Sequence, residues 1–194
     1  MGNTYQEYAA NLISVLQDQS WDKVELLCQA MDTAWQSGRQ LFLCGNGGSA
    51  ANAVHLANDY LYGVGTESVR GIKVEALPSN SAILTCLAND LSYDEIYAQQ
   101  IKVKAAPKDV LVILSGSGNS KNVIRALETG NEMGMHTFAI LGYSGGICAE
   151  IAQVAIHFPI DDMQVSEDLQ LIVGHMCMQY LYHRIKESHS DLET

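Results

Sequence analysis

Two histidines and two carboxylates in this chain have residue types that suit acid–base or metal chemistry. His55 and Asp59 are four residues apart, a spacing that places both side chains on one face of a helix. Glu167 and His175 lie around the start of a late helical pattern. Imidazoles and carboxylates together can bind Zn²⁺ or another divalent ion, and the same groups can instead move a proton between neighbouring carbons. From residue types alone, both kinds of chemistry stay open.

Two loops rich in Gly and Ser are the second feature that could do chemistry. Residues 45–49 read Gly-Asn-Gly-Gly-Ser, and residues 115–120 read Ser-Gly-Ser-Gly-Asn-Ser. Glycine lets the backbone approach an anion closely, and a following helix offers free N–H groups and the positive end of its dipole. Neither loop has the spacing of a dinucleotide-binding or Walker motif. A single such loop could be only a turn with a Ser cap, whereas two of them after core strands predict phosphate binding.

The elements that must position these residues follow an alternating pattern. Short apolar segments predict strands at 40–44, 74–77, 110–114, 136–141 and 154–158. Helical spacing predicts helices at 4–37 with a break near Ser20, at 49–62, 92–104 and 120–133, after the 142–146 loop, and at 166–187. This alternation predicts an α/β fold: a doubly wound, flavodoxin-like, mainly parallel sheet with an N-terminal helical arm. Ligands of such sheets bind beyond the carboxyl ends of the strands, where both Gly/Ser loops would lie.

Composition and charge exclude several classes of partner. The 194 residues include 11 Lys and Arg against 22 Asp and Glu, giving a formal charge of −11. A surface so acidic argues against nucleic acid and against anionic lipid, so a bound phosphate would be held by backbone N–H groups and hydroxyls. No apolar run reaches the length of a membrane span, and the start at 1–7 lacks the features of a secretion signal. The five cysteines are odd in number and lie in apolar surroundings, which favours reduced core residues and a cytoplasmic location.

Three motifs together resemble the SIS (sugar isomerase) domain family, and most closely its phosphoheptose isomerase branch. They are the loop and helix start at 45–53, the Leu-Ala-Asn-Asp sequence at 87–90, and the serine-rich loop at 114–120. The resemblance implies one SIS domain over 1–194, with a helical oligomerisation arm at 1–37 and a phosphosugar-binding core at 38–194. It further implies an aldose–ketose isomerase that converts sedoheptulose 7-phosphate to a heptose 7-phosphate for surface polysaccharide. Similar proteins look like homotetramers with active sites near subunit interfaces.

The same resemblance implies a role for each matching residue. Asp59 and His175 would be the catalytic acid–base pair. One zinc ion per site would be held by His55, Asp59, Glu167 and His175. The substrate would contact a larger set that includes the phosphate-binding serines: Asn46, Gly47, Gly48, Ser49, Asn89, Asp90, Ser115, Gly116, Ser117, Ser120 and Glu167.

The chain departs from the family pattern at positions close to this chemistry. Asp59 stands where the family has Glu, the pair Glu167-Asp168 where it has Gln-Glu, and Gln170 where it has His. A carboxylate that is one methylene shorter moves its oxygens by roughly an ångström, which matters in a catalytic site. Two alternatives therefore remain: a non-catalytic phosphosugar-binding regulator or scaffold, and an isomerase of a different phosphosugar. His175 and the acidic groups favour an enzyme, because a scaffold needs none of them.

Overall fold

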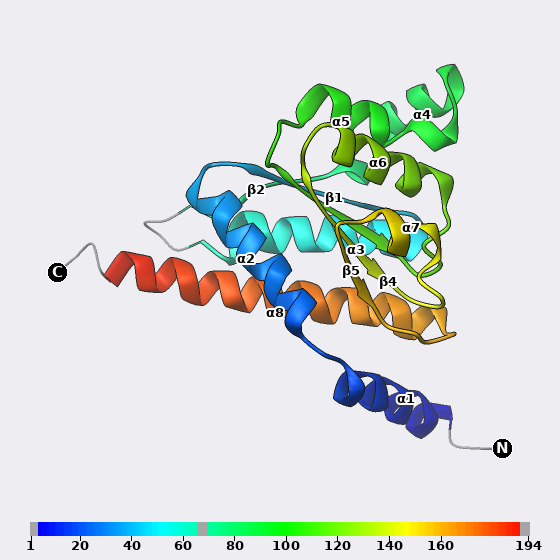
Figure 1. The fold of residues 1–194 in the computed structure, drawn as a ribbon, viewed down its shortest axis with the longest axis vertical. Helices are drawn as coiled ribbons and strands as arrows, with labels where there is room; N and C mark the ends of the chain where they lie inside the picture. The colour runs from blue at the N-terminus through cyan, green and yellow to red at the C-terminus, as the bar shows by residue number, and fades with distance from the viewer. Residues whose placement is uncertain (1–3, 66–69, 191–194) are drawn as a thin grey trace.

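A five-stranded, all-parallel sheet forms the centre of the fold. The computed structural model describes residues 4–65 and 70–190 (Figure 1). The strands run in the order β2-β1-β3-β4-β5, which is the flavodoxin-like order, so the predicted α/β class is confirmed. Their bounds are β1 Gln40–Gly45, β2 Lys73–Ala76, β3 Val110–Ser115, β4 His136–Leu141 and β5 Val154–His157.

Helices cover both faces of the sheet, as Figure 1 shows. Leu41 and Leu43 of β1 belong to the core beneath α2, α3 and α8, whereas Phe42 and Cys44 point to the opposite core. This alternation follows from the period of two along a strand. The first layer comprises α2 Asp22–Gln36, α3 Gly47–Asn58 and α8 Met163–Ser190. The second comprises α4 Ser81–Asp90, α5 Ala98–Lys104, α6 Lys121–Glu132 and α7 Gly146–Ile151.

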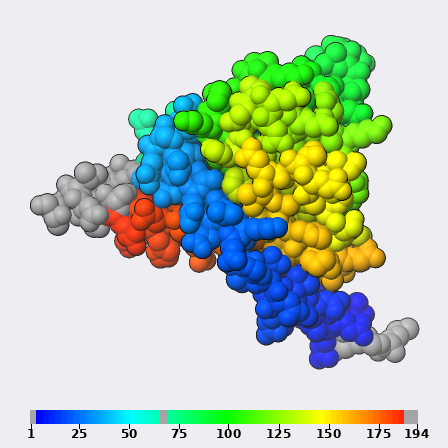
Figure 2. Space-filling model, in the orientation of Figure 1, coloured from blue at the N-terminus to red at the C-terminus, as the bar shows by residue number. Residues whose placement is uncertain are grey.

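The N-terminal arm begins with α1, Thr4–Asp18, which extends away from the body of the molecule (Figures 1 and 2). The predicted break near Ser20 separates α1 from α2. No residue of α1 is buried, although Tyr8 reaches the body and donates a hydrogen bond from its hydroxyl to Asp168 Oδ2 at 2.5 Å. Residues 1–3 of the expected arm lie outside the described residues.

The carboxyl ends of β1 and β3 lie side by side, since Gly45 pairs with Leu114. From β1 the chain continues to β2 on one side, and from β3 it continues to β4 on the opposite side. The strand order therefore reverses between β1 and β3. Ligands of open α/β sheets bind at such a point. Both Gly/Ser loops leave the sheet here, as the sequence predicted.

Helix α4 is a feature that the sequence analysis missed. It occupies 81–90, and its start is capped by Asn80 Oδ1, which accepts the N–H of Ile83 at 3.2 Å. The Asn-Asp sequence at 89–90 is therefore the end of a helix and not a free turn. The helix predicted at 92–104 is a short 3₁₀ turn at 93–95 followed by α5.

Two other helices differ at their ends from the predicted ranges. The helix expected at 49–62 ends as α3 at Asn58 and continues as a π-helical turn, Asp59–Gly63. Helix α8 begins at Met163 instead of residue 166, because Asp162 Oδ1 accepts the N–H of Val165 at 3.0 Å and caps the helix there.

Four of the five cysteines are buried, as expected, but Cys86 is exposed. The core interpretation is wrong for Cys86 because α4, which carries it, lies at the edge of the molecule and buries none of its residues completely. None of the described helices combines the length and the apolar character that crossing a membrane requires.

Candidate active site

The close crossing of α3 and α8 brings the two candidate histidines together. At the crossing, a Cβ on Gly174 would overlap the side chain of Leu56, so a larger residue at 174 would force Leu56 or the helix to shift. The Tyr60 hydroxyl donates to the Gly174 carbonyl at 2.9 Å, and burial raises the pKa of this phenol well above its usual value, which keeps it a donor. Because His55 and His175 are the sequence neighbours of Leu56 and Gly174, the crossing places them next to each other, with their ring planes at 74°.

His55, Asp59 and His175 form one cluster. The Nε2 atoms of the two histidines are 3.1 Å apart, and each lies 3.4 Å from Asp59 Oδ2. The Asp59 carbonyl accepts the N–H of Val64 at 3.1 Å in the π-helical turn, a local irregularity often found at functional sites. The histidine side chains are half exposed, whereas that of Asp59 is 17% exposed. The cluster therefore has a sheltered carboxylate and an open side.

The geometry of this cluster fits a tetrahedral metal. Zinc bonds of about 2.0–2.1 Å place neighbouring ligand atoms roughly 3.3 Å apart, close to the separations of the two imidazole nitrogens and the carboxylate oxygen. Two histidines with one carboxylate are also a ligand set that catalytic zinc sites use, with a fourth position open.

Glu167 lies outside this cluster. A Cβ on Gly48 would overlap the Glu167 carboxylate, so this side chain lies directly against the first turn of α3. The structure thus brings together three of the four residues that the sequence analysis expected to bind zinc. Glu167 instead borders the glycine loop.

The glycine loop after β1 is held by an amide pair that the sequence did not reveal. Asn46 and Asn122 exchange two hydrogen bonds, at 2.8 and 2.7 Å, and the Tyr93 hydroxyl donates to Asn46 Oδ1 at 3.0 Å. Asn122 is 1% exposed, at the start of α6. Its only sequence signal is its place two residues after the serine-rich loop. Gly47 has φ +54°, a conformation that favours glycine.

The serine loop after β3 is compact and well connected. Ser115 Oγ accepts the N–H of Gly118 at 3.1 Å, and Ser117 Oγ accepts the N–H of Asn119 at 3.3 Å. Gly118 has φ +66°, and a Cβ there would overlap the Gly145 carbonyl. Ser120 is the N-cap residue of α6. Ser115 and Ser117 accept in these bonds, so each hydroxyl still has a proton that it can donate to an anion.

Asn89 and Asp90 are less closely connected with the loops. Both are exposed at the end of α4, where Asn89 Nδ2 donates to Asp90 Oδ1 at 2.9 Å. Among the described residues, their side chains make no hydrogen bond to either loop. The link from this region to the glycine loop comes instead from Tyr93, three residues further on.

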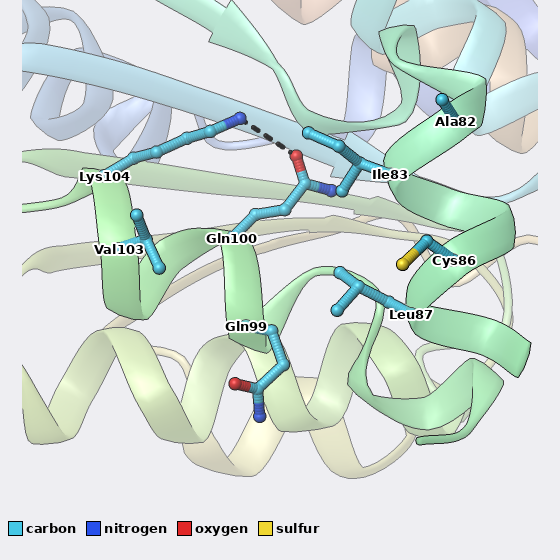
Figure 3. Close-up of a pocket in the computed structure, with 8 residues that line it drawn as sticks. All are labelled: Ala82, Ile83, Cys86, Leu87, Gln99, Gln100, Val103 and Lys104. Atoms are coloured by element: carbon cyan, nitrogen blue, oxygen red, sulfur yellow. Dashed lines mark hydrogen bonds between the residues drawn. The ribbon is translucent and has the colours of Figure 1, made fainter. Parts of the chain in front are cut away.

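A groove between α4 and α5 is separate from the His–Asp cluster (Figure 3). It has a volume of about 500 Å³, and Ile83, Leu87 and Val103 give it an apolar character. Lys104 Nζ donates to Gln100 Oε1 at 3.1 Å along one side of it, the dashed line of Figure 3. The groove lacks the glycine-rich backbone that would suit a phosphate.

Comparison with known proteins agrees with this fold and site. The sequence profile of the SIS domain matches residues 4–142, and the chain therefore belongs to the SIS domain family. A phosphoheptose isomerase of Geotalea daltonii is 39% identical over 84% of this chain and 82% of that protein. Another, from a Synechocystis species, is 36% identical over 80% of this chain and 78% of its own length. Within the SIS family, the chain belongs with the phosphoheptose isomerases.

Solved structures give the same result. The phosphoheptose isomerase of Neisseria gonorrhoeae superposes with a TM-score of 0.84 at 26% identity, covering 92% of this chain and 96% of that chain. A phosphoheptose isomerase from Francisella tularensis has a TM-score of 0.87 at 21% identity, covering 93% and 96%. This second likeness bears on the fold alone.

Proposed function

We propose that this protein is an aldose–ketose isomerase that converts sedoheptulose 7-phosphate to a heptose 7-phosphate for surface polysaccharide synthesis. The observation that carries the proposal is the cluster of His55, Asp59 and His175 on α3 and α8, the two helices that also border the glycine loop, in a chain that belongs with the phosphoheptose isomerases. A loop pair alone would fit any phosphosugar-binding protein. The cluster supplies the acid–base groups that isomerisation needs.

The phosphate end of the substrate is assigned to the two loops. Backbone N–H groups at the starts of α3 and α6, with the positive ends of the helix dipoles, favour a phosphate there without a lysine. Hydroxyls supply the remaining donors. The proposed set comprises Gly47, Gly48, Ser49, Ser115, Gly116, Ser117 and Ser120.

The sugar end is assigned to polar side chains around the same loops. Asn46 is already oriented by Asn122 and Tyr93, which suits recognition of a hydroxyl. Glu167 borders the glycine loop and can accept from another sugar hydroxyl. Asn89 and Asp90 are assigned from the family resemblance. The bound substrate, instead of a direct hydrogen bond, would connect them with the loops.

The reaction requires a proton to leave the carbon next to the carbonyl and to return to the adjacent carbon, through an enediol. Asp59 and His175 are the proposed acid–base pair. Without a metal, the 3.4 Å between Asp59 Oδ2 and His175 Nε2 is short enough for an ion pair. The side chains of His55 and His175 are half exposed, so the substrate can reach the cluster from that side.

Zinc is the proposed cofactor, one ion per site, held by His55, Asp59 and His175. The tetrahedral spacing of their ligand atoms supports this proposal. Bound zinc would polarise the substrate oxygens and stabilise negative charge on them. Glu167, outside the cluster, then remains free as a carboxylate that can contact the substrate or hold a proton near it.

The proposal extends to assembly and location. Residues 1–37 are proposed as an oligomerisation arm and 38–194 as the phosphosugar-binding core of one SIS domain. A homotetramer with active sites near its interfaces would cover α1, which buries none of its own residues in one chain. The cytoplasm is the proposed location because it keeps the buried thiols reduced.

A panel of ketose phosphates tests the proposed function and its alternatives. The protein is incubated with sedoheptulose 7-phosphate and with shorter ketose phosphates, and aldose formation is followed by NMR. Conversion of the seven-carbon sugar with the highest kcat/KM is the expected result. A higher kcat/KM on another ketose would identify a different isomerase. Binding of these sugars without conversion of any would instead support a regulator or scaffold.

A further inference from the structure

Within the part of the chain that the structure describes, Ser49 has a buried hydroxyl that accepts a hydrogen bond and donates none. It is 4% exposed, in the first turn of α3, and its Oγ accepts a hydrogen bond from Gln170 Nε2 at 3.0 Å. Across 4–65 and 70–190, this hydroxyl donates no hydrogen bond of its own. Buried polar groups are nearly always paired, so this unpaired donor indicates a ligand that accepts.

We propose that Gln170 is a positioning residue that holds the Ser49 hydroxyl as a donor toward the phosphate of the substrate. This inference rests on the proposed phosphosugar function and extends it to a residue outside the two loops. A hydroxyl has one proton to donate and can accept two. Because the Gln170 amide donates to Ser49 Oγ, the Ser49 proton must point elsewhere.

The direction of the Gln170 amide is fixed by the backbone. Asn52 Nδ2 donates to the carbonyl of Glu167 at 3.0 Å, and a carbonyl can only accept. The same Nδ2 donates to Gln170 Oε1 at 3.1 Å. With its oxygen engaged in this way, Gln170 presents its nitrogen to Ser49. Gln170 is 1% exposed, so bulk water does not compete for these bonds.

This arrangement matters because the chain has few positive charges to offer a phosphate. Its formal charge is −11, and neither loop contains Lys or Arg. Donors that already point at the anion avoid the cost of reorienting when it binds. Ser49 and Gln170 belong to α3 and α8, so the donor is set by the same helix pair that forms the His–Asp cluster.

Gln170→Met tests the inference, since Met has a similar length and volume but cannot donate. We expect KM for sedoheptulose 7-phosphate to rise roughly tenfold, the usual effect of one hydrogen bond to a charged group, with kcat changed by less than twofold. Asn52→Ala is a second variant that frees the Gln170 amide to turn over, and it should raise KM severalfold. Dissociation constants for inorganic phosphate, from calorimetry, should follow the same order.

The matched control is Gln100→Met. Gln100 is also a buried glutamine, 4% exposed, and its Nε2 donates to the carbonyls of Leu77 and Ile96 at 3.1 and 2.9 Å. This variant loses comparable hydrogen bonds away from the phosphate loops. Its KM should stay at the wild-type value even if its melting temperature falls as far as that of Gln170→Met.

A double-mutant cycle with Ser49→Ala decides whether Gln170 acts through Ser49. In the Ser49→Ala background, Gln170→Met should change KM and phosphate affinity by less than twofold. Equal weakening in both backgrounds, or an unchanged KM in Gln170→Met, overturns the inference while leaving the proposed function intact. If Gln170 affects phosphate binding only when Ser49 is present, the inference is supported. If that same protein isomerises no sugar phosphate, the proposed function is contradicted. Wild-type protein that binds neither phosphate nor sugar phosphate contradicts both.

Discussion

At the residue scale, the chemistry depends on three side chains whose polar atoms lie 3.1–3.4 Å apart. Two imidazole nitrogens and a carboxylate oxygen at this spacing repel one another less when a cation or shared protons lie between them. The structure separates Glu167 from this group and places it against Gly48. We therefore expect Asp59 and Glu167 to differ in their effect on metal binding.

Protein purified without chelator should contain close to one zinc ion per chain. His55→Ala and His175→Ala should each lose most of it, because removing one of three protein ligands weakens the site strongly. His183→Ala, which alters an exposed histidine of α8, is the control and should keep the metal. Glu167→Gln should also keep it while lowering kcat. Elemental analysis measures each value, and a Glu167→Gln protein without zinc would contradict the three-residue site.

The residue roles were only partly predictable. The sequence indicated His55, Asp59 and His175, because their types and the family motifs single them out. It did not indicate Asn122, Tyr93 or Asn52, which are common polar residues whose roles depend on contacts between distant segments. The position of Glu167 depends on where α8 crosses α3, and no local pattern contains that information.

At the scale of elements, the α3–α8 crossing assembles the site. Leu56 packs where a Cβ of residue 174 would lie, so the helices approach closely only because this residue is Gly. The strands were predictable from short continuous apolar runs, which are typical of a sheet covered on both faces. Helix α4 was missed because its apolar residues, among them Ile83 and Leu87, are at most half buried, and its ending Asn-Asp pair resembles a turn.

Gly174→Ala should push α3 and α8 apart. We expect a loss of about 1–3 kcal/mol in the free energy of unfolding, the usual cost of overpacking a core. Zinc affinity should fall as well, because the His55–His175 distance would increase. Gly130→Ala is a comparison within α6, where the Cβ would instead crowd Leu111 and Thr137. It should lower stability without changing zinc affinity, as denaturant melts and metal titrations can show. Unchanged zinc affinity in Gly174→Ala would contradict this account of the crossing.

The contact between α1 and α8 should depend on pH in the alkaline range. The hydrogen bond to Asp168, followed by burial, raises the pKa of Tyr8 from 10.0 to about 12. A raised pKa means that the contact stabilises the arm fully below pH 10 and loses this effect as the pH rises through 12. Subtracting the ultraviolet titration of Tyr8→Phe from that of the wild type should leave one transition near pH 12. A difference transition near pH 10 would show that Tyr8 is not held by Asp168.

At the scale of the whole molecule, α1 is a helix that a single chain covers only in part. Tyr5 is 87% and Ile13 54% exposed, and a 15-residue helix is marginal alone in water. Symmetric association of several chains would bury these side chains. No local pattern of the sequence encodes the number of chains, so a tetramer is expected only from the family resemblance.

Light scattering at micromolar concentration should give a mass close to four times that of one chain. Ile13→Asp should shift the protein to smaller species, because it places a charge in the proposed interface. Asn11→Asp adds the same charge at an exposed polar position of α1 and should leave the mass unchanged. A wild-type monomer under these conditions would contradict the proposed role of the arm.

The central claim is that the His55–Asp59–His175 cluster moves a proton between adjacent carbons of a seven-carbon sugar phosphate. Deuterium uptake from heavy water into sedoheptulose 7-phosphate, at the carbon next to the carbonyl, measures this step directly. The wild type should incorporate deuterium, and Asp59→Asn and His175→Ala should do so at least about 100-fold more slowly. Asp18→Asn, an exposed carboxylate of α1, should retain the wild-type rate. Uptake that is absent in the wild type, or that proceeds at the same rate without Asp59 and His175, would contradict the account.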